Sequence, residues 1–161
     1  MNLLYYGNSY TAVNGSVNAL VDRLAEEAGL VVPASVPRTF AGKNLAYHLN
    51  TNQVEAISRS LPLGEEWDHV ILQGGTVEAA ATAGNPAKFV ADGLSIMANV
   101  RAHSPQAGAV IYQTWARGAG HSFYQGAAPK YPGPLDMHLE LEEGNEQLAA
   151  ATKGAPEAGA A

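Results

Sequence analysis

The sequence predicts an α/β protein, a three-layer α/β/α sandwich built on a mainly parallel sheet of the flavodoxin type. The main reason is the order of its elements. Short apolar, strand-like runs alternate along the chain with longer segments that have helical character. The second reason is the first run, Leu3–Tyr6, which is apolar throughout and therefore typical of a buried central strand in a parallel sheet.

Four strands are expected. The second is rich in β-branched residues, and its prolines indicate an edge position because proline cannot donate a hydrogen bond to a neighbouring strand. The third ends at a pair of glycines, Gly74 and Gly75. The expected strands cover residues 3–6, 30–36, 69–73 and 108–114.

Each strand is followed by an expected helix. The first carries its apolar residues on one face and ends at Gly29, the usual residue at a helix C-terminus. Pro86 is well placed to open the third helix. A long loop rich in glycine, alanine and proline precedes the fourth. The expected helices cover residues 16–28, 45–60, 86–102 and 135–152.

At 161 residues the chain is long enough for one domain with its own core. We assign residues 1–152 to that domain and residues 153–161, which contain no core residue, to a flexible tail. After the last helix the pattern predicts a fifth strand, and none follows. The domain is therefore expected to be incomplete, truncated after the fourth strand and its helix.

Composition excludes several classes of function. The net charge is −6 and the pI is near 5.2, so the chain does not have the excess of basic residues that is typical of a nucleic-acid-binding protein. No apolar run approaches the roughly 20 residues of a membrane span, and no signal peptide is recognisable, so a cytoplasmic location is the default expectation. Because the chain has no cysteine, disulfides and thiolate chemistry are excluded. The histidines show no metal-ligand spacing, so no metal or other cofactor is expected.

The chemistry is expected at Ser9, which follows the first strand and precedes the first helix. In an open parallel sheet, ligands bind at the carboxyl ends of the strands, where helix N-termini present unpaired N–H groups. A serine in this place suits a nucleophile. The alternative is a serine that caps the helix or closes a turn, and position alone favours that alternative.

Three loops, at residues 7–11, 40–44 and 73–76, should meet at this sheet edge. Together they supply the Ser9 hydroxyl, the backbone N–H of Gly42 and the side-chain amide of Gln73. A hydroxyl nucleophile beside N–H donors is typical of enzymes that catalyse acyl transfer. The N–H donors form an oxyanion hole, which binds the negative charge that develops on the carbonyl oxygen.

The motifs on these loops resemble those of the SGNH hydrolases, also called GDSL-like lipases and esterases. Residues 7–11, Gly-Asn-Ser-Tyr-Thr, look like the first block of that family, and residues 41–45, Ala-Gly-Lys-Asn-Leu, look like the second. The resemblance implies that Ser9 is the nucleophile and that the N–H groups of Ser9 and Gly42 hold the oxyanion. The third block, usually Gly-x-Asn-Asp, does not match. Gly75 stands near the place of its asparagine, and Gln73 is the nearest amide.

The last block of that family, Asp-x-x-His, supplies the general base and is absent from this sequence. His121 in the long loop and His138 near the start of the last helix are the alternatives for a base. The alternative for His121 is an exposed loop histidine, and Asp136 near His138 fits the N-terminal turn of the last helix. Tyr10 and Trp115 are expected to line a substrate pocket, although both could equally pack in the core.

The sequence therefore predicts a serine esterase that cleaves a small-molecule acyl or sugar ester through Ser9. Little or no activity is expected of these 161 residues alone, because an unassisted serine hydroxyl is a weak nucleophile. Two alternatives stay open. One is a non-catalytic module that binds an acyl or glycan ligand on the same fold. The other is an active enzyme that uses His121 or His138 as its base. The sequence does not indicate an oligomeric state.

Overall fold

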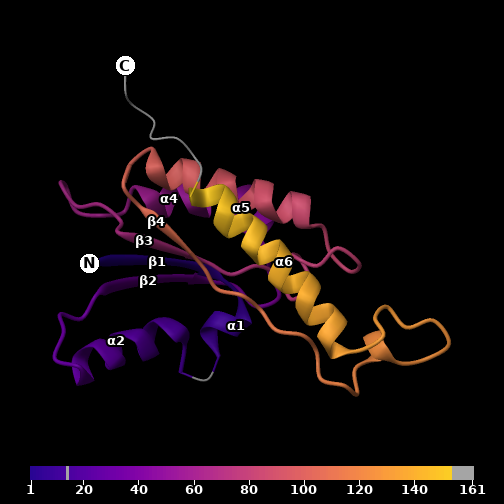
Figure 1. Cartoon of the computed structure of the whole chain (residues 1–161). Coiled ribbons are helices and arrows are strands. Elements are labelled where there is room, and N and C mark those ends of the chain that lie inside the picture. Colours follow the sequence, from indigo (N-terminus) through magenta and orange to yellow (C-terminus); the bar gives the residue numbers. More distant parts are fainter. Residues whose placement is uncertain (14, 154–161) are drawn as a thin grey trace.

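The structure is a computed structural model that describes residues 1–13 and 15–153. Four parallel strands form one sheet in the order β2-β1-β3-β4, which confirms the predicted α/β class and the edge position of the second strand (Figure 1). The strands are β1 (Asn2–Gly7), β2 (Ala34–Thr39), β3 (His69–Leu72) and β4 (Gly108–Ile111).

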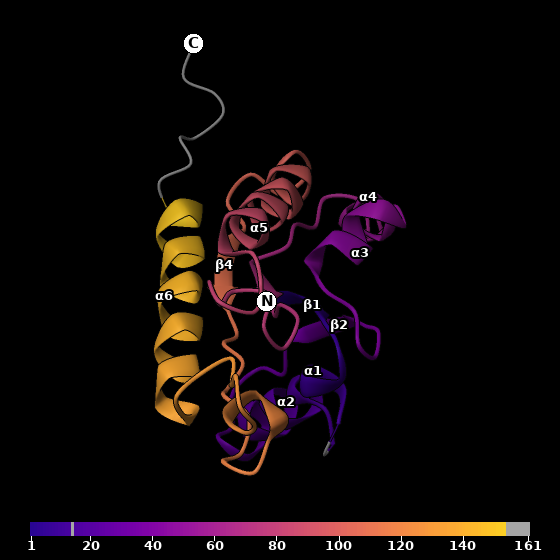
Figure 2. The same ribbon diagram turned by 90° about the vertical axis from the view of Figure 1, so that its right-hand side faces the viewer.

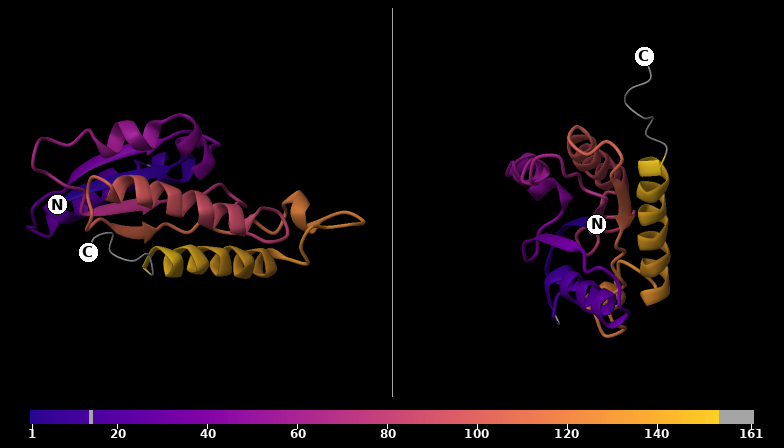
Figure 3. Two further views of the ribbon diagram at one scale, coloured as in Figure 1. Left: turned by 90° about the horizontal axis from the view of Figure 1, so that it is seen from above. Right: turned by 90° about the vertical axis from the view of Figure 1, so that its left-hand side faces the viewer.

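Helices cover both faces of the sheet, so the molecule has the three expected layers (Figure 2). The short α1 and the longer α2 lie on one face, and α3, α4 and α5 lie on the other. The last helix, α6, packs beside α5 and β4 (Figure 3). The helical elements are α1 (Ser9–Ala12), α2 (Val17–Glu27), α3 (Leu45–Asn50), α4 (Gln53–Ser58), α5 (Pro86–Arg101), the 3₁₀ turn η1 (Ser122–Tyr124) and α6 (Pro134–Lys153).

The core is divided by the alternation of side chains along β1. Leu4 and Tyr6 are fully buried in the larger cluster, beneath α3 to α6. Leu3 and Tyr5 point the other way, into a small cluster with Ile71 that the apolar face of α2 covers. Because both faces of β1 are covered, its apolar run identifies a central strand, as the sequence predicts.

Two predicted elements differ most from the structure, and the fourth strand ends at Ile111 rather than at Thr114. The helix expected over residues 45–60 is two short helices, because Asn52 adopts a left-handed conformation with φ of 55° that no α-helix can continue through. The second strand begins at Ala34 rather than Leu30, since its pairing with β1 starts opposite Asn2, near the chain start. Val31 is consequently 88% exposed.

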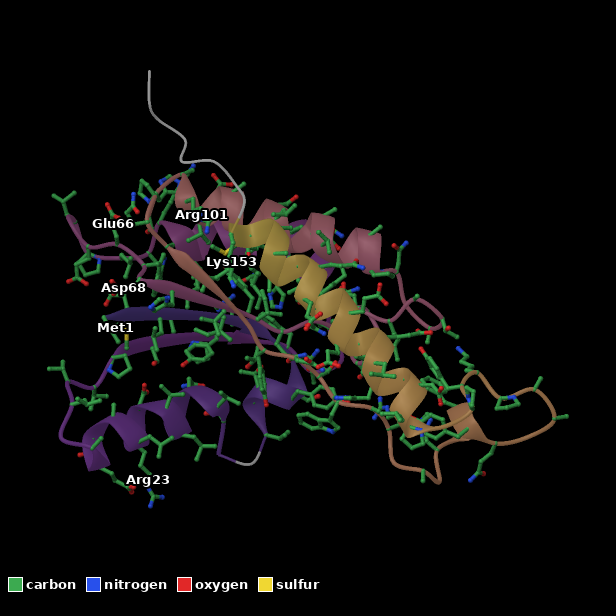
Figure 4. The ribbon with its side chains drawn as sticks, in the orientation of Figure 1. Met1, Arg23, Glu66, Asp68, Arg101 and Lys153 are labelled. Carbon is green, nitrogen blue, oxygen red and sulfur yellow. The ribbon has the colours of Figure 1, made fainter. Side chains whose placement is uncertain are left out.

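The ends of the elements are tied together at the side of the sheet away from the strands' carboxyl ends (Figure 4). Asp68 Oδ2 accepts from the backbone N–H of Asn2 at 2.6 Å and lies 3.9 Å from the α-amino group of Met1. The Arg101 guanidinium donates to the Thr152 carbonyl oxygen at 3.2 Å.

The described residues hold no fifth strand and no helix that is both long and apolar enough to cross a bilayer. Of the tail expected at residues 153–161, Lys153 is the last residue of α6, and the rest lies outside the described residues.

Candidate active site

The side chain of Asn8 joins the three loops that the sequence predicts to meet. It caps α1, since its Oδ1 accepts from the backbone N–H of Tyr10 at 3.1 Å. Its Nδ2 donates to the carbonyl oxygens of Lys43 at 2.8 Å and Gly74 at 3.1 Å. Asn8 is 3% exposed, and its bond to the Gly74 carbonyl oxygen is buried. One amide therefore fixes the loops that follow β1, β2 and β3 relative to one another.

Gln73 lies beneath the same loop and is fully buried. Its Oε1 accepts from the backbone N–H of Asn8 at 2.9 Å and from Thr11 Oγ1 at 3.1 Å, and its Nε2 donates to the Gly74 carbonyl oxygen. The expectation that Gln73 donates to an oxyanion does not fit this geometry. Its amide is directed inward and its polar atoms are engaged by the protein, so its role here is to support the Ser9 loop.

Gly7 is required by the same packing. A Cβ at Gly7 would lie 2.5 Å from Thr11 Oγ1 and 3.0 Å from Gln73 Oε1, too close for both contacts. The glycine of the Gly-Asn-Ser motif thus leaves room for the two side chains that hold the loop from below.

Ser9 is the first residue of α1 and is half-buried. Within the part of the chain that the structure describes, its hydroxyl makes no hydrogen bond, and neither its backbone N–H nor that of Gly42 donates to a protein acceptor. Gly42 is exposed and has φ of 69°, the left-handed conformation that glycine tolerates best. The hydroxyl and both predicted oxyanion donors are therefore unoccupied by protein groups.

The two histidines expected as alternative bases are not bonded to Ser9. His121 caps η1, accepting from the Phe123 backbone N–H at 3.2 Å, and its ring contacts the Phe123 ring at 4.5 Å between centroids. His138 lies half-buried on α6. Neither of them forms a Ser–His pair anywhere in residues 1–13 and 15–153.

His48, on α3, is fully buried under the Ser9 loop. Its Nε2 lies 3.2 Å from the Gly7 carbonyl oxygen, and its ring makes edge contacts with Tyr6 and Tyr47 and a tilted contact with Phe40. Burial lowers the pKa of His48 to about 4. The imidazole is therefore neutral at pH 7 and donates its Nε2 proton to Gly7.

Glu78 connects the loop after β3 to the start of α3. Its Oε2 accepts from the backbone N–H of Gly75 at 2.7 Å and of Leu45 at 3.4 Å. Burial raises the pKa of Glu78, and the two backbone donors partly oppose that shift. The N–H of Gly75, at the place of the family's third-block asparagine, is thus occupied by Glu78.

Replacing Glu78 separates its role as an acceptor from its charge. Glu78→Ala leaves the two N–H groups without a partner and is expected to lower the free energy of unfolding by about 1–3 kcal/mol. Glu78→Gln keeps an acceptor oxygen and removes a carboxylate that burial disfavours, so it should retain most of the stability at pH 7. Urea titration of both variants tests this. An equal loss in both would show that the charge, rather than the acceptor, is what matters.

The loop after β4 also reaches the site. The ring of Trp115 contacts the ring of Tyr10 edge to face at 4.6 Å, and Trp115 remains 52% exposed. Arg117 Nη2 donates to Thr76 Oγ1 at 3.3 Å. The structure thus brings together the two aromatic residues that the sequence predicts to line a substrate pocket.

A cavity of about 780 Å³ opens between the loops after β2 and β3 and the starts of α3 and α5. Gly42 is part of its wall, whereas Ser9 is not. Five of its residues lie on the loops at residues 40–44 and 73–76 that the sequence predicts to meet, and the others come from α3, the start of α5 and the segment between β3 and α5, which carry no motif. It is lined by Gly42, Lys43, Asn44, Ala46, Tyr47, Asn50, Gly75, Thr76, Val77, Glu78, Gly84, Asn85 and Lys88.

No group of three or more potential metal ligands occurs among the described residues.

No family profile matches the chain, and no curated protein matches it either. Several solved structures are similar to this chain. A protein from Slackia heliotrinireducens, provisionally assigned as an SGNH hydrolase, shares 27% identity and superimposes with a TM-score of 0.67, covering 95% of this chain and 76% of that one.

Two further structures share the fold at lower identity. A DUF4886 family protein from Bacteroides uniformis has a TM-score of 0.70 at 15% identity, and this chain covers 64% of its length. The esterase EstA from Pseudoalteromonas has a TM-score of 0.61 at 11% identity, with 73% of its length covered. The sheet order, the loops joined by Asn8 and these superpositions confirm the resemblance that the motifs indicate: the chain has the fold of the SGNH hydrolases.

Proposed function

We propose that this chain carries the nucleophile and oxyanion-binding part of an ester hydrolase, with Ser9 as the nucleophile. The observation that carries the proposal is a group of three unbonded polar groups, two on Ser9 at the start of α1 and one on Gly42 in the loop after β2. The Ser9 hydroxyl, the Ser9 N–H and the Gly42 N–H have no protein partner in residues 1–13 and 15–153, while Asn8 holds their loops together. Groups kept free of internal bonds on a fixed frame are available to a substrate.

In the proposed reaction, Ser9 Oγ attacks the ester carbonyl carbon and its proton passes to a base. The carbonyl oxygen becomes an anion and accepts from the N–H groups of Ser9 and Gly42. The tetrahedral intermediate then expels the alcohol, which takes up the proton, and water later releases the acid from the acyl-serine. No described histidine is hydrogen-bonded to Ser9, so the chain by itself should react slowly.

The test supplies the base from solution. We expect imidazole to accelerate hydrolysis of p-nitrophenyl acetate by the protein above the rate of imidazole alone, and a fluorophosphonate to add its mass to Ser9. Ser9→Ala should reduce both signals to background, whereas Ser95→Ala, which changes an exposed serine on α5, should leave them unchanged. Retention of both signals in Ser9→Ala would refute the assignment.

The absence of a histidine bonded to Ser9 among the described residues favours one second candidate, a non-catalytic ligand-binding module on the same fold. It predicts that imidazole produces no Ser9-dependent hydrolysis while a small ligand still binds. The experiment above therefore separates the two functions.

A further inference from the structure

We propose that His48 is a positioning residue for Ser9, because its imidazole and the Gln73 amide hold the Gly7–Asn8 peptide unit from opposite ends. The inference rests on the proposed esterase function, in which the orientation of the Ser9 hydroxyl and N–H decides the rate. His48 lies on α3, outside the three loops, and takes no part in the proposed reaction itself. Its effect reaches Ser9 through the backbone.

The Gly7–Asn8 peptide unit is bonded at both ends. Its carbonyl oxygen lies 3.2 Å from His48 Nε2 and accepts from the backbone N–H of Phe40, also at 3.2 Å. Its N–H donates to Gln73 Oε1 at 2.9 Å, and this bond and the one to His48 are both buried. Because a peptide unit is planar, with its N–H and C=O pointing in opposite directions, bonds at both ends stop the plane from rotating.

The peptide unit needs this restraint because it follows a glycine. Gly7 has no Cβ, so its backbone can adopt more conformations than that of other residues. Rotation of the peptide plane changes ψ of Gly7 and φ of Asn8, and it therefore turns the first residue of α1. That residue is Ser9, which carries the proposed nucleophile and one proposed oxyanion donor. A fixed peptide plane therefore fixes the direction of both groups.

Packing alone does not account for a histidine at position 48. The His48 ring is fully buried and contacts the rings of Tyr6, Phe40 and Tyr47. Its second nitrogen, Nδ1, is buried and has no hydrogen-bond partner among the described residues. Burying an unpaired polar atom costs stability, so an apolar side chain would suit the packing better. What an apolar side chain cannot supply is the N–H that His48 donates to Gly7.

Two substitutions separate the hydrogen bond from the packing. His48→Leu fills the space and removes the donor, whereas His48→Gln keeps an N–H donor at the end of its side chain. Val100→Ala is the matched control, since Val100 is fully buried on α5, next to Arg101 at the far edge of the sheet. Its truncation lowers the stability without touching the Ser9 loop. Urea denaturation ranks the stabilities of the three variants.

Hydrogen exchange tests the restraint without any chemistry at Ser9. In ¹H–¹⁵N spectra, the backbone amide of Asn8 should exchange with deuterium about threefold to tenfold faster in His48→Leu than in the parent protein, because one bond that holds its peptide unit is lost. His48→Gln should restore slow exchange, and Val100→Ala should retain it. Unchanged exchange in His48→Leu, or equal acceleration in Val100→Ala, overturns the proposal.

The reactivity of Ser9 tests the consequence, since its oxygen displaces fluoride from a fluorophosphonate. His48→Leu should lower the maximal rate of labelling by about threefold to tenfold and leave the half-saturating concentration unchanged, because orientation affects the reacting atoms rather than binding. His48→Gln should recover the rate. A full rate in His48→Leu overturns the proposal, while the esterase function stands. If the parent Ser9 takes up no fluorophosphonate, the esterase function fails, and the exchange of Asn8 alone decides whether His48 positions the loop.

Discussion

Gly144→Ala should destabilise the protein by about 2–3 kcal/mol, even though alanine is favoured over glycine in a helix by about 0.8–1.0 kcal/mol. Gly144 is buried in the middle of α6, where that helix passes against the loop after β3. A Cβ at this position would overlap the carbonyl oxygen of Ala79 and lie 3.0 Å from its Cβ. The obstacle is backbone, which cannot rotate away, so α6 must move from the core.

Urea denaturation followed by circular dichroism measures the loss, and Gly93→Ala on α5 is the matched control. The added Cβ of Gly93→Ala would meet Leu148 Cδ1 at 2.6 Å, but that atom ends a side chain that can change its rotamer. We expect Gly93→Ala to cost clearly less than Gly144→Ala. A greater loss at Gly93 would mean that α6 does not pack against the loop as described.

Acidification should weaken the fold through His48. Its pKa is about 4 in the folded protein against an ordinary value of 6.5, so below pH 6.5 the unfolded chain binds a proton that the folded chain does not. Stability from this group is complete above pH 6.5 and is lost as the pH falls towards 4. A difference of this size corresponds to about 3 kcal/mol in the free energy of unfolding.

Free energies of unfolding measured from pH 7 to pH 4.5 test this, with His48→Gln as the comparison. Glutamine keeps an N–H donor for the Gly7 carbonyl but does not titrate, so the variant should lose less stability across this range than the parent protein. Parallel curves for the two proteins would show that His48 does not titrate as proposed.

Much of the fold is readable from the sequence because β1, β3 and β4 carry apolar runs and the loops after β1 and β2 carry motifs. Leu3–Tyr6 identifies the central strand, and the prolines around β2 identify an edge. The positions of Ser9 and Gly42 follow from the same logic, since parallel strands end at one edge of the sheet. These predictions depend on periodicity and topology, which are local properties of the chain.

The direction of a polar side chain is not a local property. Gln73 stands at the predicted strand end, yet its amide faces inward because Asn8 and Thr11, far away in the sequence, supply its partners. His48 has the spacing of an ordinary helix residue, and only the position of β1 makes it a donor to Gly7. Sequence alone therefore locates the site and leaves its internal bonding open.

The bonding of Asn8 has a consequence for motion. Because a single buried amide joins three loops, none of the loops can open far without breaking a bond that restrains the others. The loops therefore behave as one cooperative unit, whose free energy of local opening exceeds that of any one of them alone. Ser9 and Gly42, which lie on different loops, should fluctuate together and keep their mutual geometry between encounters with a substrate.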